Sequence, residues 1–410
     1  MPTLRRPLEP RATTEEHRAA TPLELFFDLC FVVAVAQASN SLHHALAEGH
    51  VRQALLGFGL VFFAIWWAWM NFTWFASAYD NDDVVYRLTV LLQIAGVLIL
   101  AAGVPRAFDE RDFGIATLGY AVMRSGLVIQ WLRAARSDVA RRTTAYRYAL
   151  GVSLCMVGWG GLLLLPDDWA LAGWLVMVPA ELAVPMWAER AEPTTWHPRH
   201  IAERYGLFTL IVLGESVLSA TLALQSALDA GDELPALLAL AFGSLLIVAS
   251  LWWIYFAQPA EDVVARARSA FESGDIRFSF AWGYGHLPVF ASAAAVGAGL
   301  AVAADQAVGH AELSARGATL AVAIPVAIFM LSDWAVLGRY KERTRVGLLS
   351  SPTAALLVLV VAVATSSVLA VGVVLAATVA AFVIAEGMEE AEAARGTEST
   401  ADGTPPTAGQ

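Results

Sequence analysis

The chain has 410 residues, of which 58% are hydrophobic and only 15% charged, whereas an ordinary soluble domain carries about 25% charged residues. Its net charge of −11 excludes a nucleic-acid-binding protein, which needs a basic face, and its mean hydropathy of +0.58 excludes a chain of soluble domains alone. Cys30 and Cys155 both lie in apolar stretches, which excludes a disulfide framework or a paired-cysteine metal site.

Apolar blocks recur along the whole chain between short charged loops, and about 20 helical residues cross a hydrocarbon layer ~30 Å thick. The pattern predicts an all-α polytopic membrane protein with about twelve transmembrane helices. The predicted spans are residues 23–45, 53–76, 84–105, 113–132, 145–165, 169–188, 203–225, 234–257, 278–303, 315–337, 353–368 and 370–386. Ser366 and Ser367 interrupt the last apolar run, which forms either two short helices or one broken helix; two helices fit the membrane thickness better.

The predicted spans divide the chain into four segments. Residues 1–22 form a basic N-terminal segment, residues 23–190 a first six-helix unit, residues 191–386 a second six-helix unit, and residues 387–410 an acidic tail that we expect to be disordered. The first apolar run follows several arginines, as in a signal peptide. Because Glu24 and Asp28 interrupt it, we expect a retained first span instead.

The positions of the basic residues orient these spans. With both termini in the cytoplasm, nearly all of the 26 Lys and Arg residues fall on the inner side, and Arg124 lies inside a span. The residues on the outer side are Arg52, Arg106, Arg111 and Arg316. Because cytoplasmic loops of membrane proteins carry the excess of positive charge, the sequence predicts a multi-pass plasma-membrane protein with cytoplasmic N- and C-termini.

The two predicted units resemble each other. The second span contains FGLVFFAIWWAWMNF at residues 58–72, and the eighth contains FGSLLIVASLWWIYF at residues 242–256. Each is followed by an acidic segment that ends in Val-Val, at residues 84–85 and 263–264. The offset indicates duplication of a six-helix unit, and an even number of spans makes the two copies parallel in the membrane, as in many transporters.

Two segments of the chain are similar to a known family. TPLELFFDLCFV at residues 21–32 and RHIAERYGLFTLIVLGES at residues 199–216, with the Trp-rich second span, resemble the bacterial low temperature requirement A (LtrA) family. The resemblance covers essentially the whole membrane domain and implies a multi-spanning protein of the bacterial inner membrane linked to growth in the cold, without an established biochemical activity. The family motif falls on Glu24, Phe27, Asp28, His200, Glu203, Arg204, Gly206, Gly214 and Glu215.

The first span carries two acids, Glu24 and Asp28, four residues apart and therefore on one face of a helix. Two carboxylates this close in a low dielectric repel each other unless a cation lies between them, an arrangement suited to proton or cation exchange. The alternative is structural: Glu24 lies at the membrane interface near the helix N-terminus, and one arginine balances Asp28.

Three further residues are buried by their position in the spans. Arg124 lies about ten residues from either end of its span, so we expect it to act as a counter-charge paired with Asp28 or Glu181. Glu181 lies between Pro179 and Pro185, whose kinks free carbonyls to line a cavity. His286 is either a proton relay or ligand, or a neutral histidine with satisfied hydrogen bonds.

Glu215 lies in the middle of the seventh span, and no basic residue lies within two turns of it on its own helix. Such a carboxylate is protonated, paired from another helix or bound to a cation, and intramembrane acids commonly mark ion or proton paths. We expect Gly214 to let another backbone approach closely. By contrast, we interpret His200 and Glu203 as helix-start residues rather than metal ligands, because Pro198 interrupts their spacing.

These features predict a proton- or cation-coupled secondary transporter, with Asp28 and Glu215 as coupling acids and Arg124 as counter-charge. One alternative is a cation channel with six plus six helices, because Phe26-Phe27-Asp28 is loosely similar to the signature of a two-repeat potassium-channel family. The other is an intramembrane lipid-modifying enzyme that uses His286 with Glu215 or Glu181. We expect no cofactor, no metal and no nucleic-acid partner; the expected partners are membrane lipids and a small solute or cation, and the oligomeric state is left open.

Overall fold

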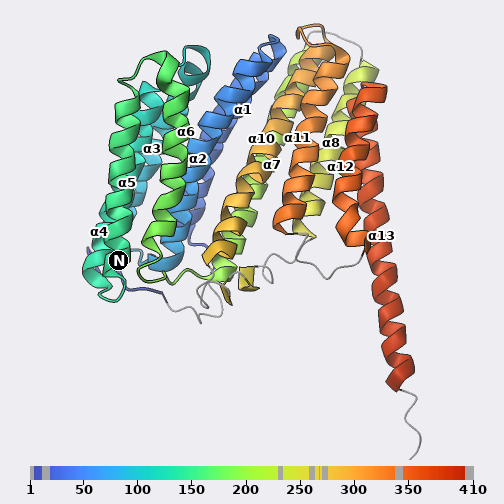
Figure 1. Ribbon diagram of the computed structural model, residues 1–410. Helices are drawn as coiled ribbons and strands as arrows, with labels where there is room; N and C mark the ends of the chain where they lie inside the picture. Colours follow the sequence, from blue (N-terminus) through green and yellow to red (C-terminus); the bar gives the residue numbers. More distant parts are fainter. Residues whose placement is uncertain are drawn as a thin grey trace, which may run out of the picture.

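The computed structural model describes residues 4–11, 19–229, 234–257, 264–266, 268–269, 276–337 and 345–401. The helices of this part of the chain lie roughly side by side in one bundle, with α1–α6 on one side and α7–α13 on the other (Figure 1). They are α1 (Pro22–Ala47), α2 (Val51–Tyr79), α3 (Val84–Asp109), α4 (Gly114–Ser137), α5 (Arg142–Leu162), α6 (Asp167–Ala188), α7 (Pro198–Asp229), α8 (Leu234–Phe256), α10 (Ile276–Ala307), α11 (Ala315–Val336), α12 (Arg345–Thr365) and α13 (Val368–Ala401).

Length and apolar composition identify the membrane-spanning helices. Among the described residues, 10 helices are long and apolar enough to cross a membrane. α12 adds a shorter apolar helix over Ser351–Thr365. Each predicted span overlaps one described helix. The structure therefore confirms a polytopic, all-helical membrane protein.

The bundle has a largely apolar core that also encloses several charged side chains, and large apolar side chains cover its outside. α2 and α10 are central: 72% and 78% of their most apolar 18-residue stretches are buried. The corresponding buried shares are only 17% for α6 and 22% for α13. Large apolar side chains such as Leu175 on α6 and Val373 on α13 are exposed, while Asp28, Arg124 and Glu181 are almost completely enclosed. This distribution suits a protein whose surroundings are lipid, because lipid chains are as apolar as leucine.

The last apolar run is divided in two, as the serine pair predicts. α12 ends at Thr365, Ser366 takes a positive φ of 52°, and the Ser367 hydroxyl accepts a hydrogen bond from the Ala370 amide at the start of α13. α13 then continues to Ala401, through much of the segment from residue 387 for which disorder is predicted. The Glu- and Ala-rich composition of residues 385–394 favours a helix, which explains the extension. Residues 402–410 lie outside the described residues.

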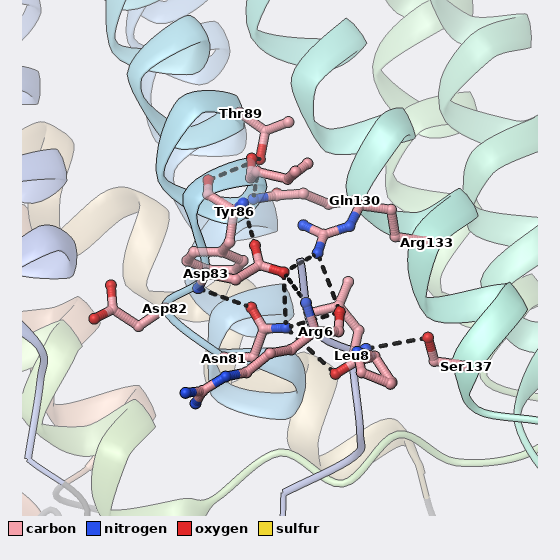
Figure 2. Close-up of polar contacts among 12 residues, drawn as sticks. Arg6, Leu8, Asn81, Asp82, Asp83, Tyr86, Thr89, Gln130, Arg133 and Ser137 are labelled. Atoms are coloured by element: carbon pink, nitrogen blue, oxygen red, sulfur yellow. Dashed lines mark hydrogen bonds and ion pairs between the residues drawn. The ribbon is translucent and has the colours of Figure 1, made fainter. Parts of the chain in front are cut away.

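Residues 4–11, which we term the N-terminal strap, pack against the ends of α2, α3 and α4. Asp83 Oδ2 accepts hydrogen bonds from the Arg6 amide at 2.7 Å and from Arg133 Nη2 at 2.6 Å (Figure 2). The Leu8 amide donates to Ser137 Oγ at 3.1 Å, and the Leu8 side chain is buried. The strap thus fixes the end of the bundle that we call the N-terminal face; the other end is the opposite face.

Asp83 connects the strap to the start of α3. It is the N-cap residue of that helix, and its Oδ1 accepts a hydrogen bond from the Tyr86 amide at 2.6 Å. Burial acts to raise the pKa of Asp83, but the hydrogen bonds from Arg6, Tyr86 and Arg133 outweigh burial and hold the pKa below its ordinary value. The carboxylate is therefore ionised at neutral pH, where it caps the helix and retains the strap.

Candidate functional site

The α1–α7 contact near the N-terminal face contains a buried group of four residues, which we term the ion cluster: Glu24, Asp28, His200 and Arg204. Arg204 donates to both Asp28 oxygens, from Nε at 2.7 Å and from Nη2 at 2.6 Å. Arg204 Nη1 lies 3.2 Å and His200 Nε2 3.1 Å from Glu24 Oε1. The charges on α1 are thus matched by basic groups on α7, and Arg204, 176 positions away in sequence, is the arginine that balances Asp28.

Local sequence positions Glu24 and Asp28, the two acids of the ion cluster on α1. Thr21 and Glu24 form a capping box, in which the Thr21 amide donates to Glu24 Oε2 at 2.8 Å while the Thr21 side chain accepts from the Glu24 amide. The other Glu24 oxygen is left to face α7. Asp28, one turn further along α1, also accepts a hydrogen bond from Trp69 Nε1 on α2 at 2.7 Å. Glu24 thus caps the start of α1 and also joins the ionic contact with α7.

Arg124 and Glu181 form a second buried pair, inside the first group of helices. Arg124 Nη2 donates to Glu181 Oε2 at 2.9 Å, and Arg124 also contacts the Tyr120 hydroxyl. Glu181 accepts three more hydrogen bonds, from Trp67, Tyr120 and Trp159. Of the two acids predicted for Arg124, the structure selects Glu181. Four donors on one carboxylate describe a saturated structural pair rather than a group open to exchange.

His286 lies in an aromatic enclosure on α10. Its Nδ1 contacts the Trp282 carbonyl oxygen at 2.8 Å, and its ring packs against Tyr205, Tyr255 and Phe290 as well as Trp282. The side chain is fully buried. Among the described residues, no hydrogen bond or ion pair joins His286 to Glu181 or Glu215, the partners required by the enzyme hypothesis.

A cavity of about 470 Å³ lies between α1, α7 and α10 toward the opposite face. Its polar lining comes from all three helices, and the exposed side chains of Asn40 and His44 show that it is reached from outside the bundle. The lining consists of Ala36, Gln37, Ser39, Asn40, His43, His44, Glu215, Leu218, Ser219, Leu222, Ala298, Ala301 and Asp305. We term it the α1–α7–α10 cavity.

Glu215 lines this cavity with a side chain that is only 5% exposed. Its Oε1 accepts a hydrogen bond from Ser219 at 2.8 Å, and its Oε2 has no hydrogen-bond partner in the described structure. Nothing in the part of the chain that the structure describes pairs it with a basic group. Of the states predicted for this carboxylate, pairing from another helix does not occur among the described residues, and protonation or a bound cation accords with this arrangement.

Close packing of α7 against α10 determines how the face of α7 next to Glu215 is oriented. A Cβ on Gly297 would lie 2.7 Å from the Ser216 Cα, so only glycine permits this approach, and the Ser216 hydroxyl donates to the Ala293 carbonyl at 2.8 Å. Gly214 was expected to serve such a contact, but it meets open space. The expectation is wrong because α10 packs on the face of α7 that carries Ser216, whereas Gly214 is on an exposed face.

The far end of the cavity carries a pair that sequence reasoning missed. His43 Nε2 on α1 lies 2.7 Å from Asp305 Oδ2 on α10, and both side chains are partly exposed. Each residue occurs in the last two turns of a long apolar helix, where a polar side chain reads as an ordinary interfacial residue. The pairing depends on the lateral packing of α1 against α10, which single-sequence patterns do not reveal.

The predicted coupling acids lie at different depths. Glu215 is eleven positions beyond Arg204 on α7, which corresponds to about 16 Å along the helix axis. Asp28 is bonded to Arg204 and therefore lies at the level of the ion cluster, whereas Glu215 lies at the cavity. Glu203 belongs to neither: it is exposed and accepts a hydrogen bond from the Ala20 amide at 3.1 Å.

The remaining motif positions have structural roles. Phe27 packs against Phe31 and Phe72 beside the ion cluster, and Gly206 faces Phe256 of α8 at ordinary contact distance. No group of three or more His, Cys, Asp or Glu side chains in the described ranges is arranged to hold a metal ion. The motif thus marks the α1–α7 contact and, through Glu215, one wall of the cavity.

A comparison with known families places the chain. The family model described as bacterial low temperature requirement A protein (LtrA) matches residues 19–386, which is nearly the whole chain. The chain belongs to the LtrA family. Both motif segments of this LtrA chain lie inside the matched range, so the ion cluster, the Arg124–Glu181 pair and the cavity are all features of its family domain.

A curated relative is similar over most of its length. An uncharacterised protein of Rhizobium meliloti (strain 1021) is 28% identical over 291 residues, which cover 68% of this LtrA chain and 68% of the relative. Its name assigns it no activity, so the chemistry of the LtrA chain has to be argued from its own buried groups.

Proposed function

We propose that this LtrA protein is a secondary transporter of the bacterial inner membrane, coupled to protons or another cation through Glu215. The observation that carries the proposal is the state of this carboxylate: enclosed, without a basic partner and in the wall of a polar cavity. A carboxylate in a membrane interior is costly unless it binds a positive charge, and this one has access to ions through the cavity.

The position of the cavity supports a carrier mechanism. α1 comes from the first group of helices and α7 and α10 from the second, so the cavity lies at the interface between the two groups, which the His43–Asp305 pair bridges at its far end. Near the N-terminal face, the same α1 and α7 are joined by the ion cluster. Transporters built from repeats bind their substrates at the interface between the repeats, which is where this cavity lies.

The packing order of the helices supports the proposal of two parallel six-helix repeats, residues 23–190 and 191–386. In the first group, α3 packs against α1 and α4, α4 against α5, and α5 against α6; in the second, α10 packs against α7 and α11, α11 against α12, and α12 against α13. Gly119 permits close approach of α4 to α3, as Gly299 does between α10 and α11. The α8–α13 contact departs from this parallel.

The basic loops support the proposed orientation. The N-terminal strap lies at the N-terminal face together with Arg87 at the start of α3, Arg133 near the end of α4 and Arg141 just before α5, while the cavity opens toward the opposite face. With the N-terminal face and both termini in the cytoplasm, as the positive-inside rule predicts, the cavity opens to the outside of the cell.

Transport by proteoliposomes tests the proposal. The purified full chain is reconstituted, and uptake of labelled cationic, neutral and anionic solutes is followed under an imposed pH gradient. We expect gradient-dependent accumulation of at least one solute, which is abolished in Glu215→Gln and retained in Glu48→Gln. The Glu48→Gln control removes an exposed carboxylate at the C-terminal end of α1, the end that lines the cavity.

Two results would contradict this proposal. One is uptake that is the same with and without the gradient, or the same in Glu215→Gln as in the unaltered chain. The other is resolved single-channel currents in planar bilayers, because the turnover of a carrier is too slow to produce them; such currents would establish the channel alternative instead.

A further inference from the structure

The lining of the α1–α7–α10 cavity selects for positive charge. Two of its side chains are the carboxylates Glu215 and Asp305, and none of the described residues that line it is Lys or Arg. The hydrogen-bonding groups of Gln37, Asn40 and Ser219 stand beside them. Because Asp305 is already in contact with His43, Glu215 is the carboxylate left to bind a ligand.

The size of the cavity exceeds what a bare ion needs. A volume of about 470 Å³ lies within the range of small-molecule sites, roughly 300–1,000 Å³, whereas one water occupies about 30 Å³. Part of the wall is apolar, formed by Leu218, Leu222, Ala298 and Ala301. The cavity therefore has room for an organic group next to the carboxylate, and that group would bury apolar surface against these side chains.

We propose that the α1–α7–α10 cavity binds small organic cations, with a protonated amine at the Glu215 carboxylate and its apolar part against α7 and α10. This inference rests on the proposed transport function and names its substrate class. One carboxylate holds either a proton or an ammonium group, so the two compete for the same oxygens, and their competition makes the protein an exchanger of amines for protons.

The exchange step conserves charge and atoms. A neutral Glu215 carboxyl gives up its proton to water in the cavity, and the resulting carboxylate accepts hydrogen bonds from the incoming R–NH₃⁺ group. One positive charge enters and one leaves, so the net charge of the site is the same before and after the exchange. The ionisable side chains of His43, His44 and Asp305 also line the cavity, which is why the proton count has to be assigned by substitution.

Calorimetry on the full chain in lipid nanodiscs tests the inference, with empty nanodiscs as the background. The probes are benzylamine, which is cationic at neutral pH, its neutral analogue benzyl alcohol and its anionic analogue benzoate. We expect saturable binding of benzylamine only, with about one proton released per amine, measured in two buffers of different ionisation enthalpy. Glu215→Gln is expected to weaken binding at least about tenfold and to abolish proton release.

Two controls assign the proton. Glu48→Gln is expected to leave both binding and proton release unchanged, and Asp305→Asn to leave proton release at about one per amine. Saturable binding of benzyl alcohol as strong as that of benzylamine, or full benzylamine binding by Glu215→Gln, would overturn the inference. If benzylamine fails to bind while gradient-driven uptake of another solute still requires Glu215, the substrate class is wrong and the transport proposal stands; if that uptake is also independent of Glu215, both are wrong.

Discussion

Two buried acids on the neighbouring helices α1 and α7, Asp28 and Glu215, differ in their hydrogen-bond and charge partners. Asp28 on α1 receives two charged hydrogen bonds from Arg204 and a third from Trp69. Glu215, which lies about 16 Å beyond Arg204 along α7, receives one hydrogen bond from Ser219. A buried carboxylate with its charge matched contributes to structure, and one without a basic partner is available to bind and release a cation. In the proposed mechanism the ion cluster therefore closes the N-terminal face, and Glu215 exchanges the cation.

The largest expected effect is a loss of protein stability when the ion cluster is broken. Arg204→Met leaves Glu24 and Asp28 buried without their common partner, and breaking a buried pair in this way costs about 3–5 kcal/mol. We expect loss of monodisperse protein or a large fall in the thermal unfolding temperature in detergent. Arg106→Ala, which removes an exposed arginine of α3, serves as the matched control and is expected to change little.

The Arg124–Glu181 pair gives the next effect and separates charge balance from hydrogen bonding. Arg124→Met alone is expected to cost about 3–5 kcal/mol, because it strands Glu181. The double variant Arg124→Met, Glu181→Met is expected to be more stable than this single variant, since replacing both members of a buried pair by apolar residues is often close to neutral. Equal unfolding temperatures for the single and double variants would show that the pair is not a charge-compensated unit.

The strap gives a smaller effect with a defined pH dependence. Asp83→Asn is expected to cost about 1–2 kcal/mol at neutral pH through the lost α3 cap and the weakened contacts to Arg6 and Arg133. Because the folded-state pKa of Asp83 is lowered, its stabilisation is complete above its ordinary pKa of about 3.9 and is lost as the pH falls through the lowered value. Thermal unfolding of both forms should therefore differ equally from about pH 5 to 8.

The same comparison of unfolding curves is extended toward more acidic buffers. The two forms are expected to converge there, since a protonated Asp83 no longer differs in charge from asparagine. A difference that grew on acidification would mean that Asp83 is stabilised in its protonated form, contrary to the contacts in Figure 2.

The smallest effect on stability is expected at Glu215. Glu215→Gln changes one hydrogen bond with Ser219 and breaks no ion pair, so we expect a change of no more than about 1 kcal/mol in the free energy of unfolding. The same substitution is expected to abolish proton-coupled uptake. Destabilisation as large as that of Arg204→Met would show that Glu215 has a structural partner.

The sequence predicts the architecture better than it predicts which acids are paired. Apolar blocks locate the helices because each must match the membrane thickness, and the serine pair at 366–367 locates the last break. The partner of Asp28 depends on which face of α7 meets α1, and Arg204 stands at the start of its span, where a basic residue also suits the cytoplasmic interface. Sequence spacing within one helix carries no information on that contact.

The residues of the cavity also show which properties the sequence can predict and which depend on packing between helices. The absence of a basic residue near Glu215 on its own helix can be read from the sequence, because that property is local, but whether another helix supplies a basic partner cannot. The His43–Asp305 pair and the contact between Gly297 and Ser216 arise from packing between distant helices. The apolar face of a helix in a membrane does not identify its neighbour, since lipid and protein surfaces are equally apolar.

Infrared spectroscopy of the purified chain tests the central claim that Glu215, and not Asp28, takes up and releases protons. Difference spectra between acidic and alkaline buffers are recorded for the unaltered chain, Glu215→Gln and Glu48→Gln. We predict a carbonyl band of a carboxyl shielded from water that disappears in Glu215→Gln and persists in Glu48→Gln. An unchanged band in Glu215→Gln would contradict the account, because the titrating buried acid would then be a different residue.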